Sequence, residues 1–422
     1  MTLRSLPLSC LALCVLVSTP LASEFPAGHL FVASQDKDTI QVYAPKGNLK
    51  ETLGQFSTLT DPSGLAFGPD GLLYALSHGS NDICVFSPSG QLLLAFGASA
   101  GLTSPRGIAI GPDGSLFVGD GGSQSIFVFT RDGTFLDSIG AGSGMGSPCA
   151  LTFSPEGHLL VASSDVGTLH EFDPSGTLLD ERGRLSGLVG AGGMALNSDG
   201  HAFVTSPSTN SILILDGEGV LIDEVAGSTA LENPGDIALG PDGLLYVVSR
   251  GTDNVMVFEQ DGALDRTIGG AKNTKAPAAL AFSPFRFKFA ARGIFAHNGH
   301  SKNLMKQEAV LSIQPGEQSL MVHFLTDEDE DKEDLVDLFG TDTVVLSGTE
   351  SFYNGDTKKR RYHGEWIPAE ASLQGIATLS VLVAGKVDKN GYFAPRAAKG
   401  TFLAASPDRV FMGSGKTSKR LK

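Results

Sequence analysis

The sequence has few cysteines and a single tryptophan. Of its four cysteines, Cys10 and Cys14 lie in an apolar N-terminal segment, which leaves Cys84 and Cys149 in the body of the chain. These two fall in non-adjacent copies of a repeat described below, too far apart for the Cα separation of about 7 Å that a disulfide allows. We therefore predict two unpaired thiols, which excludes a disulfide framework.

Basic residues and long apolar runs are also scarce. The formal net charge is −15 and the pI is near 5.0, which makes nucleic acid and anionic membrane surfaces poor partners. After the N-terminal segment no apolar run approaches the roughly 18 to 20 residues of a membrane span, so no integral membrane segment is expected. No Gly-x-Ser-x-Gly elbow and no phosphate-binding glycine loop occurs.

The first 23 residues resemble a secretory signal peptide. One arginine precedes an apolar run, and small residues end the segment near Ala22. We expect residues 1–23 to be removed and the mature protein to be secreted or periplasmic. A lipoprotein modified at Cys10 or Cys14 is the alternative.

A repeat of 43 residues dominates the rest of the chain. The glycines that close one tight turn recur at this spacing, at Gly28, Gly71, Gly114, Gly157, Gly200 and Gly243. A second turn has the same period, at Gly47, Gly90, Gly133, Gly176, Gly219 and Gly262. Each copy holds four short apolar runs separated by turn residues, as in "GLAFG", "LLYAL", "DICVF" and "QLLLAFG".

Four-stranded units of this length are the size of a propeller blade, which buries its faces only against neighbouring blades. Six copies predict an all-β fold with a six-bladed β-propeller over residues 26–284. The first copy, which begins at His29, lacks its innermost strand. The segment "APAALAFSP" at residues 276–284 matches the missing strand, so we expect it to complete that blade and close the ring.

The repeats resemble the NHL-repeat family. The segment "SPRGIAIGPDGSLFVGD", followed by "QSIFVF", carries the resemblance, which covers nearly two thirds of the chain. The family implies a propeller, a fold that serves binding modules, lyases and lactonases alike. Its aspartate after the second strand survives only as Asp120, with serine in the other copies. Its arginine is absent as well, which argues against a basic nucleic-acid-binding surface.

Residues 285–422 lose the 43-residue period and read as separate strands, which predict a smaller β-sandwich-like domain. An acidic run in this region carries alternating carboxylates at Asp327, Asp329 and Asp331. Such a loop is a candidate calcium site outside the cell, where calcium is near millimolar. A solvated loop is the alternative, because the ordered glycine and the final glutamate of an EF-hand are missing. No other cofactor is expected.

Polar side chains cluster in loops on one side of the propeller's channel mouth. The position after the family's aspartate holds Gln35, His78 and Arg250 on three consecutive blades. The opposite blades carry glycine, serine or proline there. Three more candidates complete the predicted ligand-binding set, namely Arg106, Asp120 and Asp236. Solvated loop residues are the alternative, since loops on a propeller face are polar by default.

This pattern predicts a non-catalytic binding module for a protein, peptide or glycan ligand. A metal-dependent lyase, lactonase or other hydrolase at the channel is the alternative, although the innermost ring offers few metal-ligating side chains. A purely structural role in an envelope or matrix is a third reading. His29, His158 and His201 recur in one slot on the opposite face, where we expect them to face solvent.

Overall fold

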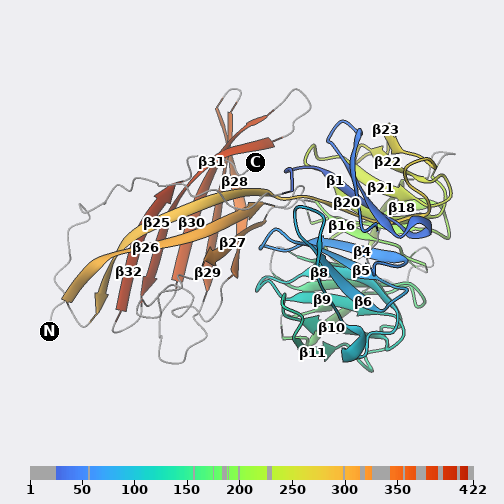
Figure 1. Cartoon of the computed structure of the whole chain (residues 1–422), viewed down its shortest axis with the longest axis horizontal. Coiled ribbons are helices and arrows are strands. Elements are labelled where there is room, and N and C mark those ends of the chain that lie inside the picture. The colour runs from blue at the N-terminus through green and yellow to red at the C-terminus, as the bar shows by residue number, and fades with distance from the viewer. Residues whose placement is uncertain are drawn as a thin grey trace.

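The turns and strands expected from the repeat are present in the computed structural model of the chain. The structure describes residues 25–55, 58–154, 157–173, 175–182, 188, 190–197, 200–225, 231–297, 300–313, 319–325, 343–354, 357–366, 377–387, 393–405 and 409–416, with side chains up to residue 284. Within these ranges, six four-stranded sheets precede a closed barrel of eight strands. Figure 1 shows the sheets in blue to yellow and the barrel in orange to red.

The innermost strands of the six sheets form a ring. In chain order they are β4 (Pro62–Phe67), β8 (Pro105–Ile110), β12 (Pro148–Phe153), β16 (Met194–Leu196), β20 (Pro234–Leu239) and β24 (Pro277–Phe282). Each of them packs beside the next, and β24 lies between β20 and β4. The ring is therefore closed.

The other strands extend each sheet outward from the ring. The second strands are β1 (Leu30–Ser34), β5 (Leu73–Ser77), β9 (Leu116–Asp120), β13 (Leu159–Ser163), β17 (Ala202–Ser206) and β21 (Leu245–Ser249). The third strands are β2 (Thr39–Tyr43), β6 (Asp82–Phe86), β10 (Ser125–Phe129), β14 (Leu169–Phe172), β18 (Ser211–Leu215) and β22 (Asn254–Phe258). The outer strands are β3 (Leu49–Leu53), β7 (Leu92–Phe96), β11 (Phe135–Ile139), β15 (Leu178–Arg182), β19 (Leu221–Val225) and β23 (Leu264–Gly269).

We number the blades along the chain. Blade 1 combines β24 with β1 to β3, and blades 2 to 6 follow as β4–β7, β8–β11, β12–β15, β16–β19 and β20–β23. Two short 3-10 helices, η1 (Gln35–Lys37) and η2 (Ala98–Ala100), lie between strands. No helix in the described part of the chain has the length and hydropathy needed to cross a membrane.

The Pro-Asp-Gly turns join the first two strands of a blade. In blade 2, Gly71 has φ of 78° and donates its N–H to the carbonyl of Gly68 at 2.9 Å. Asp70 accepts from the N–H of Leu72 at 3.0 Å and from the hydroxyl of Tyr74 at 2.7 Å. Because only glycine adopts this φ without steric cost, the turn residue recurs in each copy.

Apolar side chains fill the spaces between neighbouring blades. Between blades 1 and 2, Phe31 and Phe67 stack edge to face with their ring centroids 4.9 Å apart, and Phe25 joins them. Comparable clusters occupy the other interfaces. Cys84 and Cys149 are both buried and unpaired, as predicted. Each blade therefore depends on its neighbours for a core.

The ring closes as the sequence predicted. Strand β24 pairs antiparallel with β1, with Leu280 opposite Val32 and Phe282 opposite Leu30. Ser283 continues the pairing, since its backbone exchanges hydrogen bonds of 2.9 Å with Gly28 and His29. A strand from the end of the repeats thus completes the blade that begins them.

Residues after the propeller form a barrel, where the sequence predicted a sandwich. Eight antiparallel strands close in chain order, from β25 (Phe285–His297), β26 (His300–Ile313), β27 (Ser319–Leu325), β28 (Thr343–Asn354), β29 (Thr357–Trp366), β30 (Ala377–Val387) and β31 (Phe393–Ala405) to β32 (Arg409–Lys416). Barrels and sandwiches share the same alternating strand pattern, so the pattern alone does not separate them. The predicted calcium ligands Asp327, Asp329 and Asp331 lie outside the described residues, as does the predicted signal peptide.

Candidate functional site

On blades 1, 2, 3, 4 and 6, the last residue of the second strand holds the loop that leads into the innermost strand of its own blade. On blade 3 this residue is Asp120, whose side chain is fully buried. Its carboxylate accepts hydrogen bonds from the N–H groups of Thr103, Ser104 and Ser123 at 2.9, 2.6 and 2.9 Å, and from the Thr103 hydroxyl at 3.0 Å. Burial alone would raise the pKa of Asp120, but the bonds from Ser104 and Thr103 lower it.

Serine holds the corresponding loop on other blades. The Ser77 hydroxyl accepts from the N–H of Thr60 at 2.9 Å and donates to the Thr60 carbonyl at 3.0 Å. Ser249 binds Glu232 in the same way. The slot is therefore structural, which explains why serine replaces aspartate in most copies. Because the carboxylate of Asp120 is buried and already bonded to the chain, its position argues against the predicted contact with a ligand.

A second recurring contact links neighbouring blades. Short polar residues just before the third strand adopt positive φ, as Asp38, Asn210 and Asp253 do. Their side-chain oxygens accept from the backbone N–H that leads into the next blade, at 2.7 to 2.8 Å. Aspartate and asparagine tolerate this conformation better than other side chains. The sequence analysis missed these contacts, although the residues recur every 43 positions.

Arg250, just after β21, reaches toward the axis of the ring. Its charge interacts with groups on several blades, including Arg106 on β8, Asp236 on β20 and Asp61 before β4. Its Nε lies 3.1 Å from the position that a Cβ on Gly235 would take, so the glycine makes room for it. Burial and the nearby Arg106 lower the pKa of Arg250.

The Nε–H of Arg250 is shut off from solvent and has no hydrogen-bond partner among the described residues. Arg106, in contrast, is exposed. A buried donor without a partner costs about 1 to 3 kcal/mol, and more for a charged group. Arg250 thus carries an unsatisfied donor, and its charge is repelled by that of Arg106.

Asp236 lies beside this pair at an irregular point of β20, where Gly235 and Asp236 fall between the paired residues Pro234 and Ile237. Its two oxygens accept from the N–H of Leu280 on β24 at 3.0 Å and from its neighbour Ile237 at 2.9 Å. A Cβ on Gly193 of blade 5 would lie 2.4 Å from one oxygen, so the carboxylate occupies the space that this glycine leaves.

The pKa of Asp236 is raised to about 6. Burial is the main cause, and it outweighs the two backbone hydrogen bonds and the attraction of Arg250, which lower the pKa. A carboxyl group with this pKa changes its charge between mildly acidic and neutral pH.

His78 is connected to the site through Asp61. Its Nδ1 lies 3.1 Å from Oδ2 of Asp61 and its Nε2 lies 3.2 Å from the hydroxyl of Ser104. Gln35 lies in η1, where its N–H donates to the carbonyl of Ala276 at 3.2 Å. Of the predicted set, Arg106 and Asp236 both act on Arg250 through their charges, and His78 is linked to Arg250 through Asp61.

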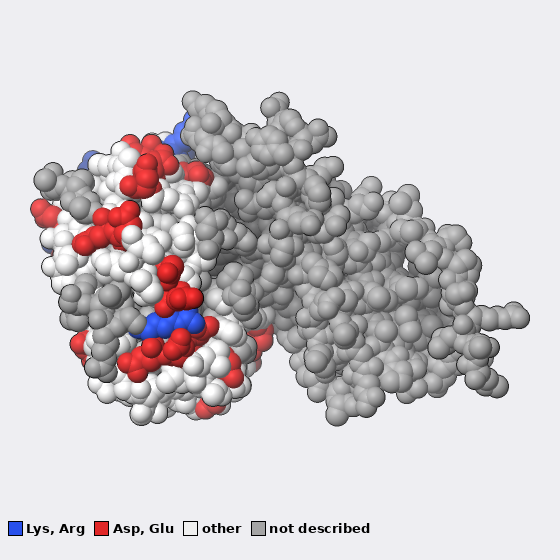
Figure 2. Space-filling model, turned by 180° about the vertical axis from the view of Figure 1, so that it is seen from behind, with Lys and Arg blue, Asp and Glu red and all other residues white. Residues whose placement is uncertain are grey.

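Within the part of the chain that the structure describes, no three His, Cys, Asp or Glu side chains gather as a metal ligand set. Acidic side chains form several patches on the propeller face shown in Figure 2, where basic side chains cover smaller areas. The arginines at the mouth thus belong to a protein whose overall charge is strongly negative.

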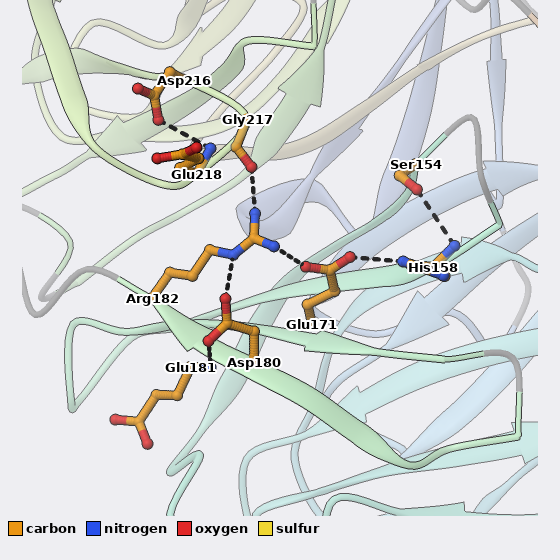
Figure 3. Close-up of polar contacts among 9 residues, drawn as sticks. All are labelled: Ser154, His158, Glu171, Asp180, Glu181, Arg182, Asp216, Gly217 and Glu218. Carbon is orange, nitrogen blue, oxygen red and sulfur yellow. Dashed lines mark hydrogen bonds and ion pairs between the residues drawn. The ribbon is translucent and has the colours of Figure 1, made fainter.

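A separate polar network joins blades 4 and 5 (Figure 3). Nδ1 of His158 lies 2.6 Å from Oε1 of Glu171, and Arg182 bonds Glu171, Asp180 and the carbonyl of Gly217. His158 is thus half-buried in an ion-pair network rather than simply facing solvent. The contacts among these groups indicate a role in holding the two blades together.

Comparisons with known proteins support the fold. No sequence model of a protein family and no curated protein matches the chain. A solved structure of the nidogen/laminin complex is 19% identical, over 60% of this chain and 98% of that chain, with a TM-score of 0.51. Virginiamycin B lyase from Staphylococcus aureus is 14% identical, over 71% of this chain and 90% of that chain, with a TM-score of 0.44.

A streptogramin B lyase is also 14% identical, over 92% of this chain and 98% of that chain, with a TM-score of 0.44. At 19% identity, the nidogen/laminin structure shows only a shared architecture. The chain contains a six-bladed β-propeller, and its membership of the NHL-repeat family stays a prediction.

Proposed function

We propose that the chain is a secreted or periplasmic protein that binds a protein, peptide or glycan at its channel mouth without catalysing a reaction. The observation that carries the proposal is the pair of arginines at the axis. Arg250 holds an enclosed donor without a partner in the described residues, and Arg106 stands exposed beside it. An anionic ligand group at the two guanidinium groups offsets the repulsion between their like charges, which lowers the pKa of Arg250.

The uneven distribution of charged side chains around the channel mouth supports the same proposal. Charged groups converge from blades 6, 2 and 3, while Ser164 and Pro207 occupy the corresponding slots on blades 4 and 5. Binding sites on propellers are built from loops that a rigid ring positions. One half of this mouth therefore offers charge and hydrogen bonds to a ligand, and the other half offers small neutral side chains.

The test compares two variants as baits for partners from the culture medium or the periplasm. The double variant Arg106→Ala with Arg250→Ala should keep its fold and lose the partner that the parent captures. Ser164→Ala, on the other half of the mouth, should capture it normally. Equal capture by both variants would place the site elsewhere. One tightly bound calcium or zinc ion per chain in the same preparation would instead favour the metal-dependent lyase or hydrolase.

A further inference from the structure

The charges around the axial arginines nearly cancel, and this balance indicates the chemistry of the ligand. Arg106 and Arg250 bring two positive charges, while Asp61 and Asp236 bring two negative charges when both are ionised. Asp61 has a separate partner in His78. Among the described residues, no cationic side chain lies within hydrogen-bonding distance of Asp236, and the hydrogen bonds to its carboxylate come from backbone N–H groups.

We propose that the mouth binds a carboxylate group of the ligand between Arg106 and Arg250, and that Asp236 competes with this group until it takes up a proton. This inference rests on the proposed function of the same site. An arginine fork matches a carboxylate in shape, and its hydrogen bonds to an anion are strong. A singly charged ligand group also fits the single positive charge that remains when Asp236 is neutral.

The surroundings of Asp236 allow it to gain a proton without losing its place. The N–H of Leu280 on β24 and the backbone of Gly193 beside β16 hold the carboxyl group from two neighbouring strands. A neutral carboxyl group keeps an acceptor oxygen for Leu280. Protonation therefore removes a charge near Arg250 while the local packing stays the same.

Other titratable groups near the cluster have assignable roles. Burial raises the pKa of the Cys149 thiol on β12 to about 12, so this group stays neutral at the pH values of the test. His78 is the other titratable neighbour, because it contacts Asp61, whose charge acts on Arg250. A His78→Gln variant therefore separates its contribution from that of Asp236.

The test uses N-acetylglycine as a carboxylate probe and N-acetylglycinamide as its uncharged match. Binding to the full chain is followed by NMR through the Nε–H signal of Arg250, identified by its loss in Arg250→Lys. We expect N-acetylglycine to shift this signal and the amide to leave it unchanged. Affinity should be about tenfold higher at pH 5.0 than at pH 7.5, because the competent state becomes the main population.

In Asp236→Asn, affinity at pH 7.5 should match that of the parent at pH 5.0, and His78→Gln should keep the parent's pH dependence. Loss of the pH dependence in His78→Gln, or its survival in Asp236→Asn, would overturn the role of Asp236. Binding of inorganic phosphate with no response to N-acetylglycine would overturn the carboxylate assignment. If neither probe binds while partner capture still requires the two arginines, this inference fails and the proposed function stands.

Discussion

Two aspartates on opposite blades of the ring have pKa values that are shifted in opposite directions. Asp120 on blade 3 is fully enclosed, yet its pKa lies below the usual value because four hydrogen bonds reach its carboxylate. Asp236 on blade 6 receives two backbone hydrogen bonds, and burial raises its pKa to about 6. The hydrogen bonds outweigh burial at Asp120, whereas burial outweighs the hydrogen bonds at Asp236.

This difference in pKa distinguishes a carboxylate that holds a loop from one whose charge changes with pH. Asp120 fixes a loop, and its slot accepts serine on other blades because a hydroxyl can hold the same loop. Asp236 has no serine counterpart, and it stands beside arginines that are not paired with it by a hydrogen bond. The same face of the propeller thus contains both a permanent contact and a group that can change its charge.

Opening the ring should have the largest effect. A chain that ends at Lys275 lacks β24, whereas a chain that ends at Pro284 keeps it. We expect the shorter chain to aggregate, because the edge of β1 loses its paired strand and β4 and β20 lose a packing neighbour, at a cost above about 5 kcal/mol. Size-exclusion chromatography and thermal unfolding compare the two chains, and identical melting of both as monomers would contradict the closure by β24.

Removing the structural carboxylate should have the next largest effect. Asp120→Ala leaves the N–H groups of Thr103, Ser104 and Ser123 without their acceptor, which should lower the free energy of unfolding by about 3 kcal/mol. Asp120→Ser should lose less, since serine fills this slot elsewhere.

The stability that Asp120 contributes should depend on pH. The folded-state pKa of Asp120 is lowered, so its stabilisation is present above its unfolded pKa of about 3.9 and is lost as pH falls through the folded value. Urea unfolding at pH 7 and pH 3 measures both effects. A loss that is equal at the two pH values would argue against a charge-dependent role.

The smallest expected effect on stability comes from Asp236→Asn, which should stabilise the protein where Asp120→Ala destabilises it. Its folded-state pKa of about 6 means that its contribution to stability is present below about 3.9 and is lost as pH rises through 6. Asp236→Asn should therefore stabilise the protein at pH 7.5 by about 1 to 2 kcal/mol, after allowance for partial exposure.

The gain from Asp236→Asn should shrink toward pH 4, where the parent carboxyl group is already neutral. Melting temperatures across this range are the measurement, and Asp223→Asn on the exposed outer strand β19 is the matched control. If Asp236→Asn destabilises the protein at pH 7.5, the charged form is better satisfied than its hydrogen bonds indicate.

Most of the propeller and part of the candidate site could be predicted from the sequence. A fixed period of 43 residues predicted the blades, and the unmatched strand at 276–284 predicted the closure, because both are visible as local patterns. The slots of Arg106, Asp236 and Arg250 also followed from the period. Their convergence did not, since it depends on side-chain lengths and on the missing side chains of Gly193 and Gly235.

Other features required three dimensions. The charge of Asp120 suggested a ligand contact, but the four donors around it come from loops whose folding the sequence does not specify. Asp61 was overlooked because its role depends on His78, 17 residues away. The alternation of apolar and polar residues predicted a sandwich in place of the barrel of β25 to β32, because this alternation does not encode which strands pair to close the sheet.

The pairing of β24 with β1 also fixes how the propeller responds to mechanical force. The end of β24 at Phe282 lies opposite the start of β1 at Leu30, so both ends of the propeller leave from the same end of one strand pair. Tension applied through the two ends would peel this pair apart one hydrogen bond at a time, beginning at Ser283, instead of shearing all of them together. Blade 1 would therefore open first, which makes the closure the mechanical weak point of the ring.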